Sequence, residues 1–181
     1  MTNNEIMKSF LEKEVVSQLS EIGFTGKYPH FQRKKENCIE LISFQTNKWT
    51  GSFTVEVSAV FPNGKNKNCT EWDSLSEEQR NVWYTNERYR LKGMYDGWFY
   101  YRDLYVKRTI VFGKVYLDVS EKQAADFMVP RGYKCVQKFN ADTAKKICDE
   151  VNRQLVTAFK WLARFEKDKT YPSNLRSNTY A

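Results

Sequence analysis

Apolar residues recur every three or four positions near both ends of the chain. In the N-terminal stretch, Met7, Leu11, Val15 and Leu19 share one helical face, and Gly23 follows where a left-handed helix cap is expected. Near the C-terminus a longer stripe holds Ala144, Ile147, Val151, Leu155, Ala158, Leu162 and Phe165. This spacing predicts amphipathic helices over residues 4–22 and 141–166.

The middle of the chain alternates apolar and polar residues with a period of two. The clearest example is Phe53-Thr-Val-Glu-Val-Ser-Ala-Val-Phe61, which predicts a strand with one buried face. Other strands are expected at residues 28–34, 38–45, 88–94, 98–108, 109–119 and 133–139, with a break near Lys107-Arg108. Ser74 and Glu77 fit a capping box that predicts a short helix over residues 75–84. Asp96-Gly97 predicts a turn, and residues 120–127 a helical turn.

These elements predict an α+β fold with a largely antiparallel sheet of about five to six strands. Long N-terminal and C-terminal helices would pack on that sheet. The short connections between strands exclude a series of parallel crossovers. We expect one domain over residues 1–166, followed by a polar C-terminal tail over residues 167–181.

The charge balance is basic but mixed. Lys and Arg number 29 and Asp and Glu number 22, which gives a formal net charge of +7. Such a balance permits an acidic protein, a nucleic acid or an anionic membrane surface as partner. It is equally typical of an ordinary solvated surface, since a nucleic-acid-binding protein usually concentrates its cations on one face.

Several kinds of chemistry lack their sequence signatures. The four cysteines, Cys38, Cys69, Cys135 and Cys148, form no CxxC pair, and there is a single histidine, His30. The chain contains no phosphate-binding glycine loop and no nucleophile elbow. We therefore expect no metal and no organic cofactor. With no signal segment and no apolar run of about 18 residues, we expect a cytoplasmic protein with free thiols and no membrane contact.

Acidic residues on neighbouring strands leave one catalytic hypothesis open. Glu40 and Glu56 lie on adjacent predicted strands, and a facing carboxylate pair can act as acid and base. Strand glutamates more often mark a solvated face. His30 follows Pro29 at a strand start and is interpreted as a surface or turn residue.

Aromatic and basic residues gather between positions 88 and 116. If residues 98–108 and 109–119 pair as a hairpin, Tyr101, Tyr105, Phe112 and Tyr116 share a face with Lys107 and Lys114, while Leu104, Val106, Val111, Val115 and Leu117 point into the core. The aromatic face would be buried core, a protein interface or a base-stacking surface. Arg88, Arg90 and Arg102 flank the Asp-Gly turn, where they would clamp an anion or pair with Asp96 and Asp103. The candidate binding residues are thus Tyr101, Tyr105, Phe112, Tyr116, Lys107, Lys114, Arg88, Arg90, Trp98 and Arg102.

Several short motifs resemble an uncharacterised bacterial family, domain of unknown function 4304, over about residues 4–165. They are Gly23-Phe24, Phe31-x-Arg33, Ile42-x-Phe44-Gln45, Phe53-Thr-Val-Glu-Val57, Arg88-x-Arg90-Leu91 and Asp96-Gly-Trp98. The lysine-rich loop at residues 63–73 and the tail depart from that pattern. The resemblance implies a soluble bacterial α+β domain and no particular activity.

Together these features favour a non-catalytic binding domain, of the kind found in immunity or accessory proteins that hold a protein partner. The alternative is nucleic-acid binding through the basic aromatic surface, for which weak, non-specific binding is expected. An enzyme that uses carboxylates is the third hypothesis.

Overall fold

The computed structural model describes residues 2–47, 49, 51–61, 66, 70–93, 97–112, 114–119 and 132–167. The N-terminal helix consists of α1 (Asn3–Leu11), a π-helical turn at Glu12–Val16 and α2 (Ser17–Glu21). The C-terminal helix is α3 (Ala141–Lys167). Thr2 and Glu5 form a capping box that fixes the start of α1. Both predicted helices are therefore confirmed; the predicted tail lies outside the described residues from position 168 onward.

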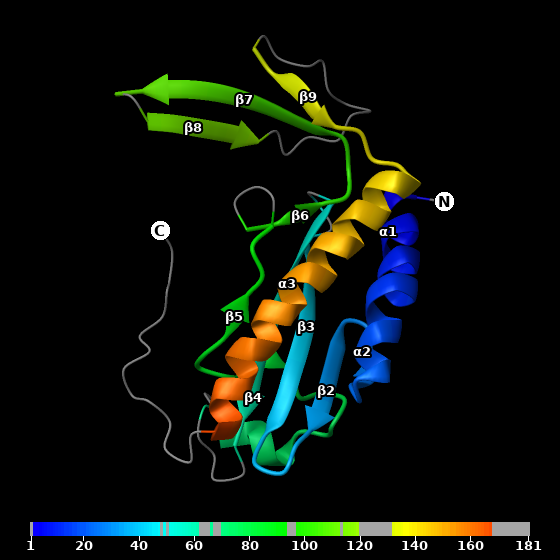
Figure 1. Ribbon diagram of the computed structural model, residues 1–181, viewed down its shortest axis with the longest axis vertical. Coiled ribbons are helices and arrows are strands. Elements are labelled where there is room, and N and C mark those ends of the chain that lie inside the picture. Colours follow the sequence, from blue (N-terminus) through cyan, green and yellow to red (C-terminus); the bar gives the residue numbers. More distant parts are fainter. Residues whose placement is uncertain are drawn as a thin grey trace.

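The main sheet is antiparallel throughout. Its strands are β1 (Thr25–Lys27), β2 (His30–Lys34), β3 (Ile39–Asn47), β4 (Ser52–Val60), β5 (Tyr89–Arg90) and β6 (Phe99–Tyr100). They follow the order β1-β2-β3-β4-β5, and β6 also pairs with β4. The two long helices cover one face of this sheet (Figure 1). This arrangement confirms the predicted α+β fold.

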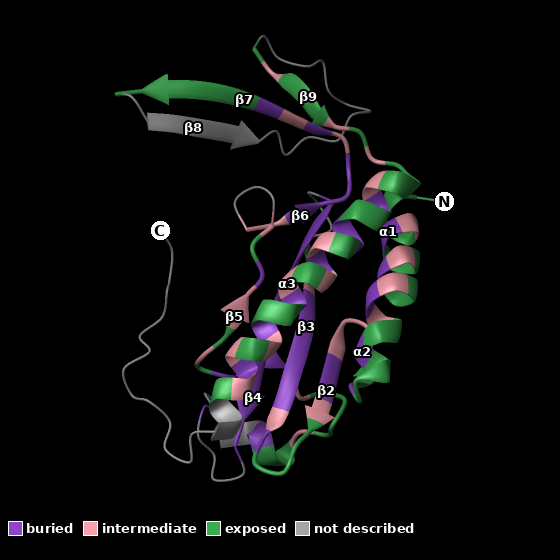
Figure 2. Ribbon diagram, in the orientation of Figure 1, coloured by how far each residue is buried: buried purple, intermediate pink, exposed green. Residues whose placement is uncertain are grey.

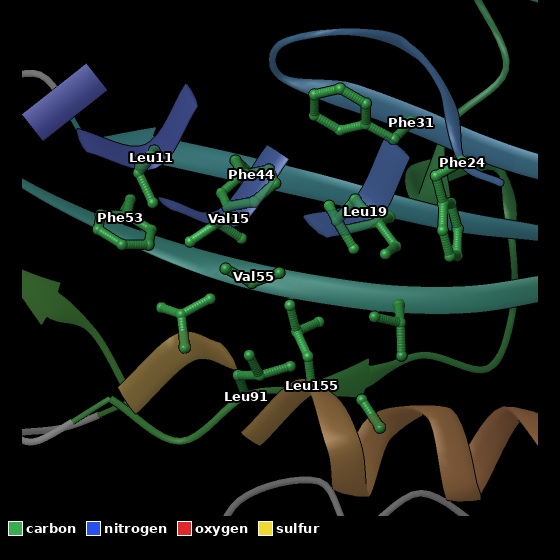
Figure 3. Packing of buried hydrophobic residues seen from close by; sticks show 14 of the residues in the cluster. Leu11, Val15, Leu19, Phe24, Phe31, Phe44, Phe53, Val55, Leu91 and Leu155 are labelled. Carbon is green, nitrogen blue, oxygen red and sulfur yellow. The ribbon is translucent and has the colours of Figure 1, made fainter. Parts of the chain in front are cut away.

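The hydrophobic core lies between the helices and the sheet. Leu11, Val15 and Leu19 point from the N-terminal helix toward Phe44 and Phe53 on the sheet (Figure 3). Leu155 packs from α3 onto the same layer. Aromatic rings form much of this layer: the centroids of Phe53 and Phe99 lie 5.2 Å apart with their planes nearly parallel.

The second face of β4 is also buried, contrary to the prediction of one buried face. Ser52, Thr54, Glu56 and Ser58 all lie within the protein, and buried residues run along the whole of β4 and the middle of β3 (Figure 2). Near one end of this second face, Leu41 and Val60 pack against Trp72 and Val82 from the segment that follows β4. That segment therefore covers this end of the second face in place of solvent. We call this second side of the sheet the outer face.

The segment over the outer face differs from the predicted helix at residues 75–84. It contains two short 3₁₀ helices, Thr70–Ser74 and Val82–Tyr84. Glu77 does not complete the expected capping box, because its carboxylate binds the Lys34 ammonium and accepts a hydrogen bond from Gln32. The Asn81 side chain instead caps the second 3₁₀ helix by accepting the Trp83 N–H at 2.9 Å.

A second sheet has three antiparallel strands. Its order is β8-β7-β9, formed by β7 (Leu104–Val111), β8 (Lys114–Val119) and β9 (Lys134–Gln137). Strand β7 runs straight through Lys107-Arg108, so the predicted break there is wrong; the chain leaves strand geometry at residues 101–103 instead. The predicted turn at residues 95–96 and helical turn at residues 120–127 lie outside the described residues. None of the described helices combines the length and the apolar character needed to cross a bilayer.

Candidate functional site

Strands β7, β8 and β9 form a sheet that projects from one end of the molecule, and we call it the arm (Figure 1). Its base is held by side-chain hydrogen bonds. The Gln137 amide donates to the carbonyl oxygens of Tyr100 at 2.7 Å and Arg102 at 3.0 Å. Asp103 accepts the Phe139 N–H at 3.0 Å. These bonds attach both ends of the arm to the main body, so the arm begins from a defined position.

Strands β7 and β8 pair as an antiparallel hairpin, as expected. Lys107 lies opposite Asp118, Thr109 opposite Tyr116, and Val111 opposite Lys114. Alternation along β7 places Tyr105 and Lys107 on one side and Leu104 and Val106 on the other. Leu104 and Val106 are buried against Tyr100 and Trp98, as predicted.

Val111 was expected to point into the core, and this expectation is wrong. Val111 lies an odd number of residues from Leu104, so strand alternation places it on the side of Tyr105. The structure shows Val111 as an exposed residue near the end of β7. The arm therefore carries apolar side chains beyond the reach of the main core.

The arm carries exposed apolar residues and exposed cations. Ile110 is 63% exposed, and Phe112 is fully exposed in the turn after β7, where its φ angle is 49°. Val136 is exposed as well, but it lies on β9 near the base of the arm, since its neighbours Cys135 and Gln137 lie opposite Tyr105 and Leu104. Three exposed cations, Lys107, Arg108 and Lys134, lie between the base and the free end. Exposed apolar residues at the end of a projecting sheet, here Ile110 and Phe112, are typical of a contact surface.

Tyr101 does not belong to this surface, which corrects the sequence interpretation. It precedes β7 and is only 3% exposed, with its ring stacked on Phe53 at 6.2 Å and edge-on to Phe139 at 6.2 Å. Its N–H donates to the Gly51 carbonyl at 2.9 Å. Burial raises the pKa of the Tyr101 hydroxyl to about 12. Tyr101 is therefore part of the core.

Arg102 is also buried, at the junction between the body and the arm. Its guanidinium carbon lies 5.3 Å from the centroid of the Tyr100 ring, and its aliphatic stem passes over Gly51. Gly51, in the turn before β4, has a positive φ of 59° that favours glycine, and a side chain at this position would contact the Arg102 stem. Arg102 thus contributes to the packing of the junction and lies away from the exposed part of the arm.

Arg88 and Arg90 bind a carboxylate of the chain itself. Arg90 donates from Nε and Nη2 to Glu56 Oε1 at 2.9 and 2.7 Å, and Arg88 Nη1 reaches Glu56 Oε2 at 3.4 Å. Arg88 and Arg90 thus bind Glu56 where a pairing with Asp96 or Asp103 was expected, and Asp103 accepts the Phe139 N–H. Asp96 lies outside the described residues. Two guanidinium groups on one buried carboxylate leave one excess positive charge at this edge of the sheet.

Glu40 and Glu56 cannot act as the hypothesised carboxylate pair. Glu40 lies opposite Ala59 on the core face, whereas Glu56 lies opposite Ser43 on the outer face. The two carboxylates have different arginine partners: Glu56 binds Arg88 and Arg90, and Glu40 Oε2 accepts from Arg33 Nε at 2.6 Å. The sheet separates the two groups, so they share no proton and no substrate.

His30 is more constrained than a surface residue. Its Nδ1 lies 2.9 Å from the Ser43 hydroxyl, and its ring meets Trp83 edge-on at 5.1 Å. Partial burial lowers the pKa of the imidazole below its usual value. The strand register places His30, Ser43, Glu56 and Arg90 in one row across the outer face. The sequence reasoning missed this row, because the polar residues of an alternating strand were expected to face solvent.

A hollow of about 420 Å³ lies at the end of the main sheet nearest the arm. It is lined by Gln45, Thr46, Asn47, Trp49 and Trp98. Trp98 was among the predicted binding residues, whereas the sequence reasoning did not select Trp49. In the structure the Trp49 side chain is 88% exposed. An exposed indole in the turn between two strands is the signal that points to Trp49.

Comparison with known families assigns the chain. The family model described as Domain of unknown function (DUF4304) matches residues 15–164. The chain belongs to the DUF4304 family. The match begins within the N-terminal helix and continues through the arm into α3, so the family region includes both sheets. No curated protein and no solved structure matches the chain significantly.

Proposed function

We propose that this DUF4304 domain is a non-catalytic binding domain whose arm docks onto a partner protein. The observation that carries the proposal is the exposure of Ile110 and Phe112 at the free end of a projecting sheet. Fully exposed aromatic side chains of this kind become the buried centre of an interface when they enter a pocket on a partner.

The chemistry of the arm also suggests the character of the partner. Lys107, Arg108 and Lys134 are exposed on the same sheet as the apolar residues. A partner with an apolar pocket and an acidic rim would match both features, because complementary charges direct association while buried apolar area supplies affinity. The chain itself would then act as an immunity-type or accessory protein in a bacterial cytoplasm. Among the residues that the structure describes, Cys38, Cys135 and Cys148 form no disulfide bond, which is compatible with a reducing compartment.

Nucleic-acid binding is the second candidate, supported by the position of Tyr105 and Lys107 on one face of β7. The burial of Tyr101 removes one of the three tyrosines on which base stacking was expected to depend. We therefore expect weak binding to generic DNA or RNA that declines steeply with salt. Submicromolar affinity in about 0.2 M salt would replace the protein-binding proposal with this one.

Affinity capture from an extract of the source cells, followed by quantitative mass spectrometry, tests the proposal. The test variant combines Ile110→Asp with Phe112→Asp, and the matched control is Val156→Asp. Val156 is an apolar residue that is 55% exposed on α3, which belongs to the main body. A specific partner should be retained by the wild type and the control and lost by the arm variant. Equal recovery by all three proteins would refute the role of the arm.

A further inference from the structure

Strand β5 is the last strand in the order of the main sheet and lies at its margin (Figure 1). Cationic and apolar residues alternate along it, in the sequence Arg88-Tyr-Arg-Leu-Lys92. Leu91 is fully buried in the core, so strand alternation places Arg88, Arg90 and Lys92 together on the outer face. We propose that this edge binds an extended segment of a partner protein in which acidic and apolar residues alternate. The edge belongs to the main body, and the proposal does not depend on the function of the arm.

The backbone of β5 is available for an added strand at two residues. The Leu91 N–H donates to the Val55 carbonyl at 2.9 Å, which directs the backbone groups of Leu91 toward β4. Because these groups alternate in direction along an antiparallel strand, the N–H and C=O of Arg88 and Arg90 point away from β4. No hydrogen bond joins them on that side to any residue that the structure describes. A strand edge in this state is a template for pairing with another chain.

The next position along the same edge has its outward backbone groups satisfied. The Lys92 N–H donates to Gln154 Oε1 at 2.6 Å, and the Lys92 carbonyl accepts from Gln154 Nε2 at 2.6 Å. The side-chain amide from α3 thus makes both bonds that a further strand would make to Lys92. Arg88 and Arg90 have no equivalent among the described residues, so an added strand would run along these two residues and end beside Gln154.

The side chains of this edge carry more positive charge than Glu56 neutralises. The Arg88 and Arg90 side chains bind Glu56 but remain 37% and 35% exposed. Arg90 uses Nε and Nη2 for Glu56, and Arg88 uses Nη1 alone, so each guanidinium keeps further N–H groups for a second carboxylate. Lys92 is exposed, and its ammonium forms no ion pair with a described residue. Acidic residues at alternate positions of an added strand, about 6–7 Å apart, would lie beside these cations.

The opposite side of the same edge is aromatic. Tyr89 and Trp161 are both half-buried against the core, and their ring centroids lie 5.8 Å apart. In an added strand, the residues between the acidic ones would face this side. Apolar side chains at these positions would extend the aromatic contact and bury more of both rings. The edge therefore favours a segment that alternates in charge and apolarity, as β5 itself does.

Amide hydrogen exchange, followed by nuclear magnetic resonance of the full chain, tests the proposal. The probe is the peptide acetyl-Thr-Glu-Val-Glu-Ile-Glu-Val-Thr-amide. A peptide of the same composition with its glutamates consecutive, and a single-stranded oligothymidine, are the comparisons. We expect the alternating peptide to bind with a Kd of about 0.1 mM or tighter at low ionic strength. It should slow the exchange of the Arg88 and Arg90 N–H groups and leave the arm unchanged.

Two charge reversals localise the binding. Lys92→Glu changes an exposed side chain of the edge and should weaken binding of the alternating peptide about tenfold or more. Lys27→Glu is the matched control, because Lys27 is an exposed lysine on β1 at the other edge of the same sheet, and it should bind like wild type. The proposal is overturned if the alternating peptide does not bind, if Lys92→Glu binds it like wild type, or if the Arg90 N–H exchanges at the same rate in its presence. Equal or tighter binding of the rearranged peptide or the oligothymidine would also overturn it, since charge alone would then account for the contact.

Discussion

Substitution of Tyr101 by alanine should destabilise the domain strongly. The ring is 3% exposed and contacts Phe53 and Phe139 at centroid distances of 6.2 Å, so its removal leaves a cavity in the core. Loss of a core aromatic side chain costs about 3–5 kcal/mol of unfolding free energy. In a domain of this size that corresponds to a decrease in Tm of about 6–20 °C. Urea denaturation and thermal melting, both followed by circular dichroism, measure the two quantities.

Phe112→Ala provides the matched control, because Phe112 is another aromatic residue of the same region but is fully exposed. Its effect should stay within about 0.5 kcal/mol. If Tyr101→Ala were as mild as Phe112→Ala, Tyr101 would lie on the surface, and the described junction between body and arm would be wrong.

The ionisation of Tyr101 gives a second readout of the same burial. Its pKa is raised to about 12, compared with about 10 for an exposed tyrosine. The unfolded state therefore releases the Tyr101 hydroxyl proton at a lower pH than the folded state does. The contribution of protonated Tyr101 to the free energy of unfolding is complete below about pH 10 and is lost as the pH rises toward 12. The two-unit difference corresponds to about 3 kcal/mol. Tyr101→Phe should reduce this alkaline loss; an unchanged pH profile would contradict the burial.

Three further predictions concern single side chains. Glu56→Gln should lower the free energy of unfolding by about 1–3 kcal/mol, because it leaves two facing arginines without a counter-charge. Arg88→Ala should lower it by less than about 1 kcal/mol, since the Arg88 contact is 3.4 Å long and partly exposed, and equal losses in urea denaturation would contradict this ordering. Burial raises the pKa of the Cys148 thiol to about 12, so peptide-mapped iodoacetamide labelling at about pH 8 should modify the exposed Cys135 and spare Cys148 in the folded protein. The pKa of His30, the single histidine, should lie below about 6.5 in the proton magnetic resonance spectrum of tag-free protein. Because the folded state favours the neutral ring, the free energy of unfolding should fall as the pH drops through that range. A titration midpoint at or above 6.5 would refute the burial of His30.

The sequence pattern was sufficient for the helices and the core face of the sheet. Residues 53–59 alternate strictly, and the helical stripe that contains Leu155 repeats over several turns, so each element shows its buried side without reference to the rest of the chain. The outer face was misinterpreted because this local pattern marks every polar position of the strand as exposed to solvent. Thr54 and Glu56 are polar in sequence, and only the tertiary packing of other segments shows that both are buried.

The candidate site required information that local patterns do not contain. Tyr101 and Tyr105 have the same spacing as neighbours on one strand face, but the chain crosses from the main sheet to the arm between them. Lys107-Arg108 resembles a turn because both residues are charged, yet a strand that projects into solvent accepts charge on both faces. The salt bridges of Glu56 depend on the register of β4 with β5, which joins residues more than 30 positions apart.

Site-specific photo-crosslinking tests the central claim most directly. A photoreactive benzoylphenylalanine replaces Phe112 at the free end of the arm, and in a control protein it replaces Val156 on α3. After irradiation in the source cells, we predict a discrete protein adduct from position 112 and none from position 156. Absence of a protein adduct at position 112, or an adduct there that is digested by nuclease, would contradict the proposal that the arm binds a protein.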